Sequence, residues 1–360
     1  MGRPTKIIIQ LDALEHNLQQ IKTLAPQSSI LAMVKSNAYG HGIERITLAL
    51  KNADAFGVAC IEEGLLVRKA GVTHPVVLME GLFTDDELSE AAAARFSLVV
   101  HHEAQVQLFE MHPASPPVSV WLKIDTGMNR LGFASHRVKE MYQRLSACPS
   151  VKKPIGLMSH FSSADLPDPI FTQEQITRFN TITQDLSGPR SLCNSAGIMA
   201  FPSAQHEWVR PGLMLYGVSP LASNHQSHQL QPVMSLQSEL IAIHDIAKGA
   251  CVGYGRTWTA LENKRIGVVA IGYGDGYPQC ARAGTPVLVN NQLCPIVGKV
   301  SMDMLTVDIS SQPNAKIGDP VILWGKGLPV EKVAEGNHTS AYELLTRITQ
   351  RVKVMVSANR

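Results

Sequence analysis

The stretch that decides the fold contains an apolar strand, a lysine and a glycine-rich turn: Ala32-Met33-Val34-Lys35-Ser36-Asn37-Ala38-Tyr39-Gly40-His41-Gly42. The residues before the lysine are almost all apolar, which is typical of a parallel strand buried on both faces. Asn37 and the glycines then predict a turn before a helix that begins near Ile43. Proteins of the α/β class place their chemistry at the carboxyl ends of such strands, so Lys35 is a candidate nucleophile. A lone lysine at a strand end more often extends into solvent, so its function depends on what lies near it.

The bulk composition indicates a folded protein with a large apolar core. The chain has 360 residues, of which 45% are hydrophobic and 17% are charged, and its net charge is +2. It has no basic run, so nucleic acid is not an expected partner. The six cysteines are scattered and form no CxxC pair, which predicts neither a metal site nor a disulfide framework. The start lacks a signal-peptide pattern and no apolar run matches a membrane span, so we expect a cytoplasmic protein without a membrane partner.

Strand-like and helix-like segments alternate over about the first 200 residues. This alternation predicts an α/β fold that closes into a (β/α)8 TIM-like barrel. The alternative is an open doubly wound sheet, which would carry a GxGxxG turn after its first strand, and this chain has none there. The eight predicted strands cover residues 5–10, 29–34, 55–60, 75–80, 96–100, 118–125, 154–160 and 191–194.

The pattern changes near Gln231, where short strands punctuated by Gly, Pro and Asn-Asn turns replace the alternation. We therefore predict two domains, a barrel over residues 1–230 and a mostly β domain over residues 231–360. The polar segment of residues 221–231 is the predicted linker. The predicted strands of the second domain cover residues 236–244, 266–271, 286–289, 295–297, 305–309 and 320–323, followed by a closing helix over residues 340–350.

Several polar residues interrupt the predicted barrel strands or follow their carboxyl ends. They are Lys123, Arg130, His160, Ser195 with the preceding Asn194, and Arg210. Each has an ordinary alternative: a lysine that points outward, a surface arginine, a satisfied core histidine, a helix N-cap or a salt-bridge partner. Independent structural residues would not favour one end of a barrel, so together with Lys35 they predict a site there. The hydroxyl and N–H groups after the eighth strand are typical of anion binding.

These motifs resemble those of the alanine racemase family, and the resemblance runs through nearly the whole chain. The Lys35 stretch is similar to the family's pyridoxal-phosphate attachment motif. The β-rich second domain excludes the shorter, barrel-only pyridoxal-phosphate proteins. The other matching segments are Lys123–Gly132, Ser159–Phe161, Asn194–Ala196, Arg210–Gly217, Val252–Gly255, Gly272–Tyr277 and Ser301–Asp303.

The resemblance implies interconversion of L-alanine and D-alanine by two catalytic residues, either to supply D-alanine for peptidoglycan or in a catabolic role. Lys35 would hold pyridoxal 5'-phosphate as a Schiff base and act as one acid/base, and Tyr254 would be the other. Tyr254 and Met302 would reach across from the partner chain of a homodimer with shared active sites. The lysine that matches Lys123 is often carbamylated in this family. The implied cofactor-binding residues are Lys35, Tyr39, Arg130, His160, Asn194, Ser195, Arg210, Gly212, Leu213 and Tyr342, and the implied substrate-binding residues are Arg130 and Met302.

One segment departs from the family's pattern. The family usually has an arginine soon after the Gly-Tyr-x-Asp-Gly-Tyr run, where this chain has Gln279-Cys280-Ala281-Arg282. Two other functions remain open. A broad-specificity racemase would generally carry a signal peptide and paired cysteines, and a non-catalytic pyridoxal-phosphate carrier would not need Tyr254.

Overall fold

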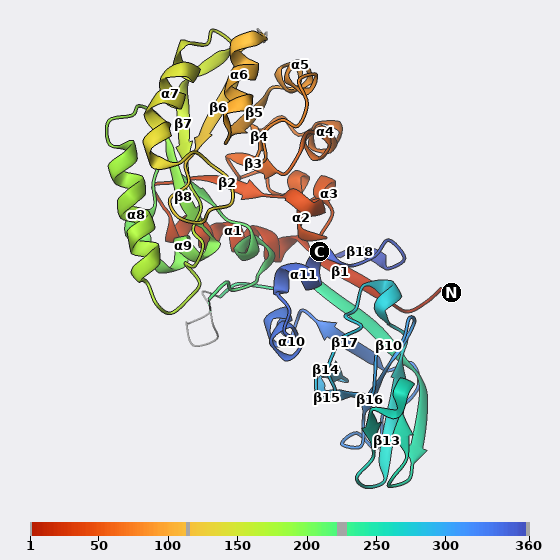
Figure 1. Ribbon diagram of the computed structural model, residues 1–360. Coiled ribbons are helices and arrows are strands. Elements are labelled where there is room, and N and C mark those ends of the chain that lie inside the picture. Colours follow the sequence, from red (N-terminus) through yellow and green to blue (C-terminus); the bar gives the residue numbers. More distant parts are fainter. Residues whose placement is uncertain (1, 113–115, 222–228, 358–360) are drawn as a thin grey trace.

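Eight parallel strands form a closed barrel in the computed structural model, which describes residues 2–112, 116–221 and 229–357. The predicted TIM-like barrel is therefore confirmed (Figure 1). All four residues of β3 and all three of β4 are buried, as their continuous apolar sequence requires. The barrel strands are β2 (Ser29–Met33), β3 (Ala55–Val58), β4 (Val76–Leu78), β5 (Phe96–Val100), β6 (Val118–Lys123), β7 (Val151–Met158), β8 (Arg190–Asn194) and β9 (Trp208–Arg210).

Helices surround the barrel and bury their apolar faces against it. In α1 the residues Leu14, Leu18 and Ile21 are fully buried at helical spacing. Two short segments, α2 (Lys35–Tyr39) and α9 (Ser195–Ala200), follow β2 and β8 directly at the carboxyl end of the barrel. The outer helices are α1 (Leu11–Leu24), α3 (Ile43–Ala49), α4 (Ile61–Lys69), α5 (Glu87–Ala93), α6 (Glu103–Met111), α7 (Val138–Ala147) and α8 (Ile170–Thr183).

The strand count was right, but one strand was assigned to the wrong sheet. The segment predicted as the first barrel strand, β1 (Lys6–Gln10), pairs antiparallel with β10 and parallel with β18 in the second domain. The barrel is closed instead by β9, which pairs with β8 and β2. The sequence of a five-residue apolar strand does not show which strand it pairs with. The three residues of β9 are too few to show the periodicity of a strand.

The second domain is built on an eight-stranded sheet in the order β13-β16-β15-β14-β17-β10-β1-β18, and β13 also pairs with β10 (Figure 1). All six predicted strands and the closing helix are present, whereas β11, β12, β18 and α10 were not predicted. Part of the predicted linker, residues 222–228, lies outside the described residues. The elements are β10 (Met234–Ile246), β11 (Cys251–Val252), β12 (Trp258–Thr259), β13 (Lys264–Val269), β14 (Pro286–Val289), β15 (Gln292–Val297), β16 (Leu305–Asp308), β17 (Pro320–Trp324), α10 (Val330–Gly336), α11 (Ala341–Thr346) and β18 (Lys353–Ser357).

A buried carboxylate joins both ends of the chain to the second domain. Asp275 is fully buried, and its oxygens lie 2.7 Å from Arg3 Nη2 and 3.0 Å from Arg351 Nε. The same carboxylate accepts the N–H of Gly272 at 2.9 Å. Because a buried charge must be paired, these contacts hold the turn around η5 (Tyr273–Asp275) in place.

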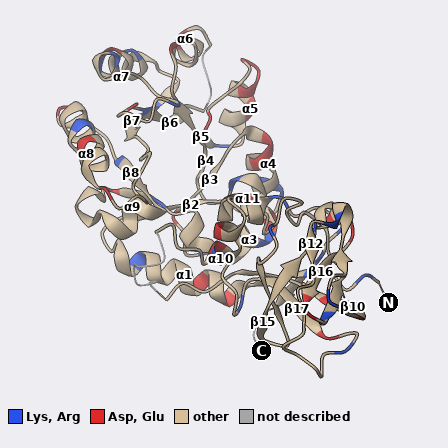
Figure 2. Ribbon diagram, turned by 60° about the horizontal axis from the view of Figure 1, so that its bottom comes forward, with Lys and Arg blue, Asp and Glu red and all other residues tan. Residues whose placement is uncertain are grey.

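Charged residues of both signs are spread over the helices of the barrel and over the β domain (Figure 2). Among the described residues, no helix has the length and apolar character needed to cross a membrane. Within the same residues, no group of three or more His, Cys, Asp and Glu side chains could hold a metal ion.

Candidate active site

A cavity of about 450 Å³ opens at the carboxyl end of the barrel strands. Lys35 and Tyr39 enter it from α2, and Tyr342 enters it from α11 of the second domain. The barrel therefore receives part of its lining from the β-rich domain. The predicted site residues that line this one cavity are Lys35, Tyr39, Lys123, Arg130, His160, Asn194, Ser195, Arg210, Gly212 and Tyr342.

Lys35 stands at the start of a left-handed turn rather than a simple loop. The φ angles of Ser36, Asn37, Ala38 and Tyr39 lie between 52° and 55°. Residues other than glycine rarely adopt this left-handed backbone conformation, because their Cβ then lies too close to the backbone carbonyl. Burial, followed by the nearby positive charge of Arg130, lowers the pKa of Lys35 below its usual value. The lysine therefore gives up its proton more readily than a surface lysine.

Lys123 points into the cavity from the end of β6, so the alternative of an outward-facing lysine is wrong. Burial lowers the pKa of Lys123 to about 7, with further lowering by the charges of Arg210, Arg130 and Lys35. A group with this pKa is partly uncharged at neutral pH. Its amine can therefore react as a nucleophile.

Arg210 and His160 form a buried pair on the wall of the cavity. Arg210 Nη2 donates to His160 Nδ1 at 3.3 Å and to the carbonyl of Ser159 at 2.5 Å, and Nη1 donates to Ser191 Oγ at 2.5 Å. Burial and the charge of Arg210 lower the pKa of His160 well below its usual value, so the imidazole is neutral. Since Nδ1 accepts from the arginine, the imidazole proton resides on Nε2. Burial lowers the pKa of Arg210 to about 10, which still leaves it charged at neutral pH.

Small polar groups line another part of the cavity. Ser195 Oγ accepts the N–H groups of Gly212 at 3.0 Å and Met214 at 3.3 Å. A Cβ at position 212 would lie 2.3 Å from Tyr39 Oη, so only glycine admits this hydroxyl. Burial raises the pKa of Tyr39, whose ring stacks on Tyr216 with 4.8 Å between centroids. The wall thus presents the neutral hydroxyls of Tyr39 and Ser195, which can donate hydrogen bonds to an anion.

One of the predicted residues, Asn194, lines the cavity and also has a structural role. Asn194 Oδ1 accepts the N–H of Gly197 at 3.0 Å. Asn194 is therefore the N-cap of α9, which was the structural alternative for this segment. Leu213, which was also predicted as a site residue, is buried and is not among the described residues that line the cavity. Glu80, which was not predicted, is the one acidic side chain among the described residues that line the cavity. Its place just after β4 is the same strand-end signal that singled out Lys35.

Tyr254 and Met302 lie elsewhere in the single chain. Their exposed fractions are 72% and 53%, and neither lines the cavity around Lys35 among the described residues. Tyr254 instead borders a separate hollow of about 660 Å³ in the second domain, together with Gln279, Cys280 and Arg282. One chain therefore does not bring the second predicted base to Lys35.

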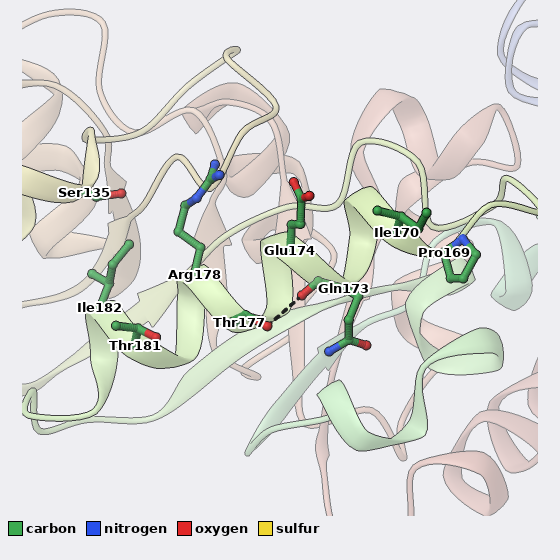
Figure 3. Close-up of a pocket in the computed structure, with 9 residues that line it drawn as sticks. All are labelled: Ser135, Pro169, Ile170, Gln173, Glu174, Thr177, Arg178, Thr181 and Ile182. Carbon is green, nitrogen blue, oxygen red and sulfur yellow. Dashed lines mark hydrogen bonds between the residues drawn. The ribbon is translucent and has the colours of Figure 1, made fainter.

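A larger groove of about 870 Å³ runs along the outer face of α8 (Figure 3). It is lined mainly by α8 side chains, and among its described lining residues none is a predicted site residue. Among its lining residues, Arg178 reaches toward the barrel, where its Nη1 donates to the carbonyl of Thr126 at 2.7 Å. The groove is therefore not the candidate site.

A lysine at the mouth of an α/β barrel, ringed by cations and completed from a β-rich domain, defines a class of barrel enzymes with a covalent cofactor site. Family models for the alanine racemase N-terminal domain and C-terminal domain match residues 9–220 and 233–356. The chain belongs to the alanine racemase family, whose members are pyridoxal-phosphate-dependent racemases.

Named relatives support the same assignment over nearly the whole chain. An alanine racemase of Coxiella burnetii is 50% identical over 359 residues, covering 98% of both chains. The biosynthetic alanine racemase of Escherichia coli K12 is 49% identical over 348 residues, covering 96% of this chain and 97% of the relative.

Solved structures share the fold. The biosynthetic alanine racemase of Pseudomonas aeruginosa matches with a TM-score of 0.96 and 43% identity, covering 99% of this chain and 100% of that one. An alanine racemase of Bartonella henselae with covalently bound pyridoxal phosphate matches with a TM-score of 0.90 and 25% identity, over 99% and 100% of the two chains.

The cavity fits an anionic cofactor of this kind. Lys35, Lys123, Arg130 and Arg210 line it together with the single carboxylate of Glu80. Among the described residues, no ion pair joins these four cations to a carboxylate. An uncompensated positive charge in a partly buried cavity is stabilised by a bound anion.

We expect Gly212→Ala to weaken binding of pyridoxal phosphate to the apoprotein roughly 10- to 100-fold, because the new Cβ would displace the Tyr39 hydroxyl. Gly336→Ala is the matched control, since a Cβ there meets only Thr285 Oγ1 at an ordinary 3.7 Å. Spectroscopic titration with the cofactor measures both affinities. Equal affinities for the two variants would contradict the position of Tyr39 in the cofactor site.

Proposed function

We propose that this protein interconverts L-alanine and D-alanine with pyridoxal phosphate held covalently by Lys35. The observation that carries the proposal is the single cavity in which a lysine of lowered pKa faces the buried Arg210–His160 pair. We further propose that the reaction takes place in the cytoplasm and supplies D-alanine for peptidoglycan, as the biosynthetic name of the E. coli relative suggests.

When bound, pyridoxal phosphate supplies an electron sink that stabilises negative charge at the substrate Cα after a proton is lost. In this proposal Lys35 accepts or returns that proton on one face of Cα, which its lowered pKa favours. Arg210 would face the pyridine nitrogen. Because its pKa of about 10 keeps it charged, Arg210 can donate a hydrogen bond there without transferring its proton. The sink is then weaker than with a proton-donating acid, which limits side reactions.

The phosphate would lie against the wall built by Ser195 and the backbone of residues 212–213. Hydroxyl groups of Tyr39 and Tyr342, whose pKa values are raised by burial, remain protonated donors at neutral pH. Asn194 supports this wall through its cap of α9. Arg130 would contact the phenolic oxygen of the cofactor and the substrate carboxylate.

The second base would come from a second copy of the chain. Tyr254 is exposed in the isolated chain and lies outside the Lys35 cavity, so it can serve there only across a subunit interface. The partner's Met302 would then narrow the cavity beside the substrate. A small closed space favours a methyl side chain, although discrimination by size alone is modest, roughly 10- to 200-fold per methylene.

The first experiment pairs a visible spectrum of the purified protein with racemisation assays. We expect an absorbance band of covalently bound cofactor and formation of D-alanine from L-alanine well above turnover of L-serine, L-methionine and L-lysine. Equal turnover of all four would indicate the broad-specificity racemase. A cofactor band without any turnover would indicate the carrier.

Mixing two inactive variants tests the shared active site. We expect Lys35→Ala to lose the visible band and the activity, and Tyr254→Phe to keep the band but lose most of the activity. If Lys35 and Tyr254 act from different subunits, random re-pairing of the two variants restores about a quarter of the sites. Racemisation is measured after co-refolding or co-expression. No recovery would contradict a shared site.

We also propose that Lys123 carries a carbamate. Its neutral amine, favoured by a pKa of about 7, would attack CO₂, form a C–N bond and release a proton to solvent. The product is an anion that Arg130 and Arg210 attract, whereas a protonated Lys123 would be repelled by these two arginines.

The ¹³C NMR spectrum of protein equilibrated with ¹³C-bicarbonate measures this modification. We expect a carbamate signal in the wild-type protein that is absent from Lys123→Met. The exposed Lys152 provides the control, because Lys152→Met should keep the signal. The same spectrum for wild type and Lys123→Met would contradict the carbamate.

A further inference from the structure

The segment that carries Lys35 into the cavity is conformationally costly. Four consecutive residues, none of them glycine, have φ between 52° and 55° in α2. L-residues in this left-handed region are unfavourable, and several in a row persist only when surrounding contacts impose them. The contacts that impose this turn therefore also set where the Lys35 side chain begins.

Glu63 in the first turn of α4 makes the main contacts at the start of this turn. One carboxylate oxygen accepts the N–H of Ser36 at 2.6 Å and lies 3.4 Å from the N–H of Asn37. The other accepts the N–H of Ala59 at 2.9 Å. Hydrogen bonds to an ionised carboxylate are short and about twice as strong as neutral ones. Glu63 thus bridges the chain after β2 to the chain after β3.

His41 holds the far end of the same turn. Its Nδ1 lies 2.8 Å from the carbonyl of Tyr39 and 3.1 Å from that of Ala38, so Nδ1 carries the proton and donates. The ring is fully buried and burial lowers the pKa of His41 to about 4, so it stays neutral. Glu63 therefore binds the backbone N–H groups at the start of the turn, and His41 binds the backbone carbonyls at its end.

We propose that Glu63 is a positioning residue for Lys35: its carboxylate holds the left-handed turn against the end of β3 and thereby fixes how the lysine enters the cavity. The proposal rests on Lys35 as the cofactor-binding base. The mechanism above does not use Glu63, which neither lines the cavity nor contacts the lysine nitrogen among the described contacts.

The charge of Glu63 acts on the lysine as well. Besides burial, the groups that act on the pKa of Lys35 are Arg130, which lowers it, and Glu80 and Glu63, which raise it. Loss of the Glu63 charge removes one of the two groups that favour the protonated nitrogen. A substitution at this position therefore has a spectroscopic consequence that a purely structural residue would lack.

Glu63→Gln tests the proposal in the holoenzyme. An amide oxygen can replace only one of the two carboxylate oxygens, and its NH₂ group would face a backbone N–H. We expect kcat/KM for alanine to fall roughly 10- to 100-fold, mainly in kcat, because small displacements of a catalytic base are costly. We also expect the pH midpoint of the cofactor's visible band to move to lower pH.

Isotope effects identify the displaced group. If each base removes the α-proton of a different enantiomer, a displaced Lys35 slows only one of the two transfers. The α-deuterium isotope effect on kcat/KM should therefore rise in Glu63→Gln for the enantiomer whose α-proton Lys35 removes. It should fall for the other enantiomer, because the slow return of a proton by Lys35 then makes the first proton transfer less rate-limiting. An equal change for both, or none, would overturn the proposal.

Glu62→Gln is the matched control, because Glu62 occupies the same turn of α4 but hydrogen-bonds Cys60. It should behave as wild type. The double variant Ser36→Gly/Glu63→Gln should regain part of kcat, since glycine adopts positive φ readily. If Glu63→Gln fails to fold, the milder Glu63→Asp is measured in the same way. A cofactor band without any wild-type turnover would defeat the proposed racemisation, and the pH midpoint alone would then decide the role of Glu63.

Discussion

The structure depends on gathering positive charge at the mouth of one barrel. Lys123 and Arg210 are buried, and Lys35 and Arg130 complete the set of basic side chains around a cavity whose described lining residues include one carboxylate, Glu80. Burial lowers the pKa values of both lysines and of Arg210, and repulsion by neighbouring cations lowers those of the two lysines further. Buried positive charge is costly without a counter-charge, so this arrangement favours the binding of an anion. The lowered pKa values increase the fraction of each lysine amine that is uncharged and can form a covalent bond.

The two domains contact each other at the site and in the sheet of the second domain. The N-terminal strand β1 lies in the sheet of the second domain, and α11 of that domain delivers Tyr342 to the barrel cavity. Gly40 next to α2 leaves room for this approach, because a Cβ there would lie 2.1 Å from the carbonyl of Leu345. The second domain is thus a structural part of the Lys35 cavity within one chain.

Most residues of the cavity could be predicted because the ends of apolar strands are visible in the sequence. Lys35, Lys123 and His160 each end or follow an apolar run, and the parallel barrel brings all such ends to one face. Glu80 was not predicted, although the same rule applies there. The strand β1 was assigned to the barrel, because an apolar pentapeptide has the same appearance in either sheet.

By itself, the sequence determined the α/β alternation, the family and the residue types that gather at the strand ends, because each is recorded in local pattern or motif. Only the tertiary structure decided which strand closes the barrel, that Lys123 points inward, and that Glu63 and His41 hold a left-handed turn beneath Lys35. These depend on contacts between segments far apart in the chain, and on burial that shifts pKa values. Neither is written in the identity or spacing of the residues concerned.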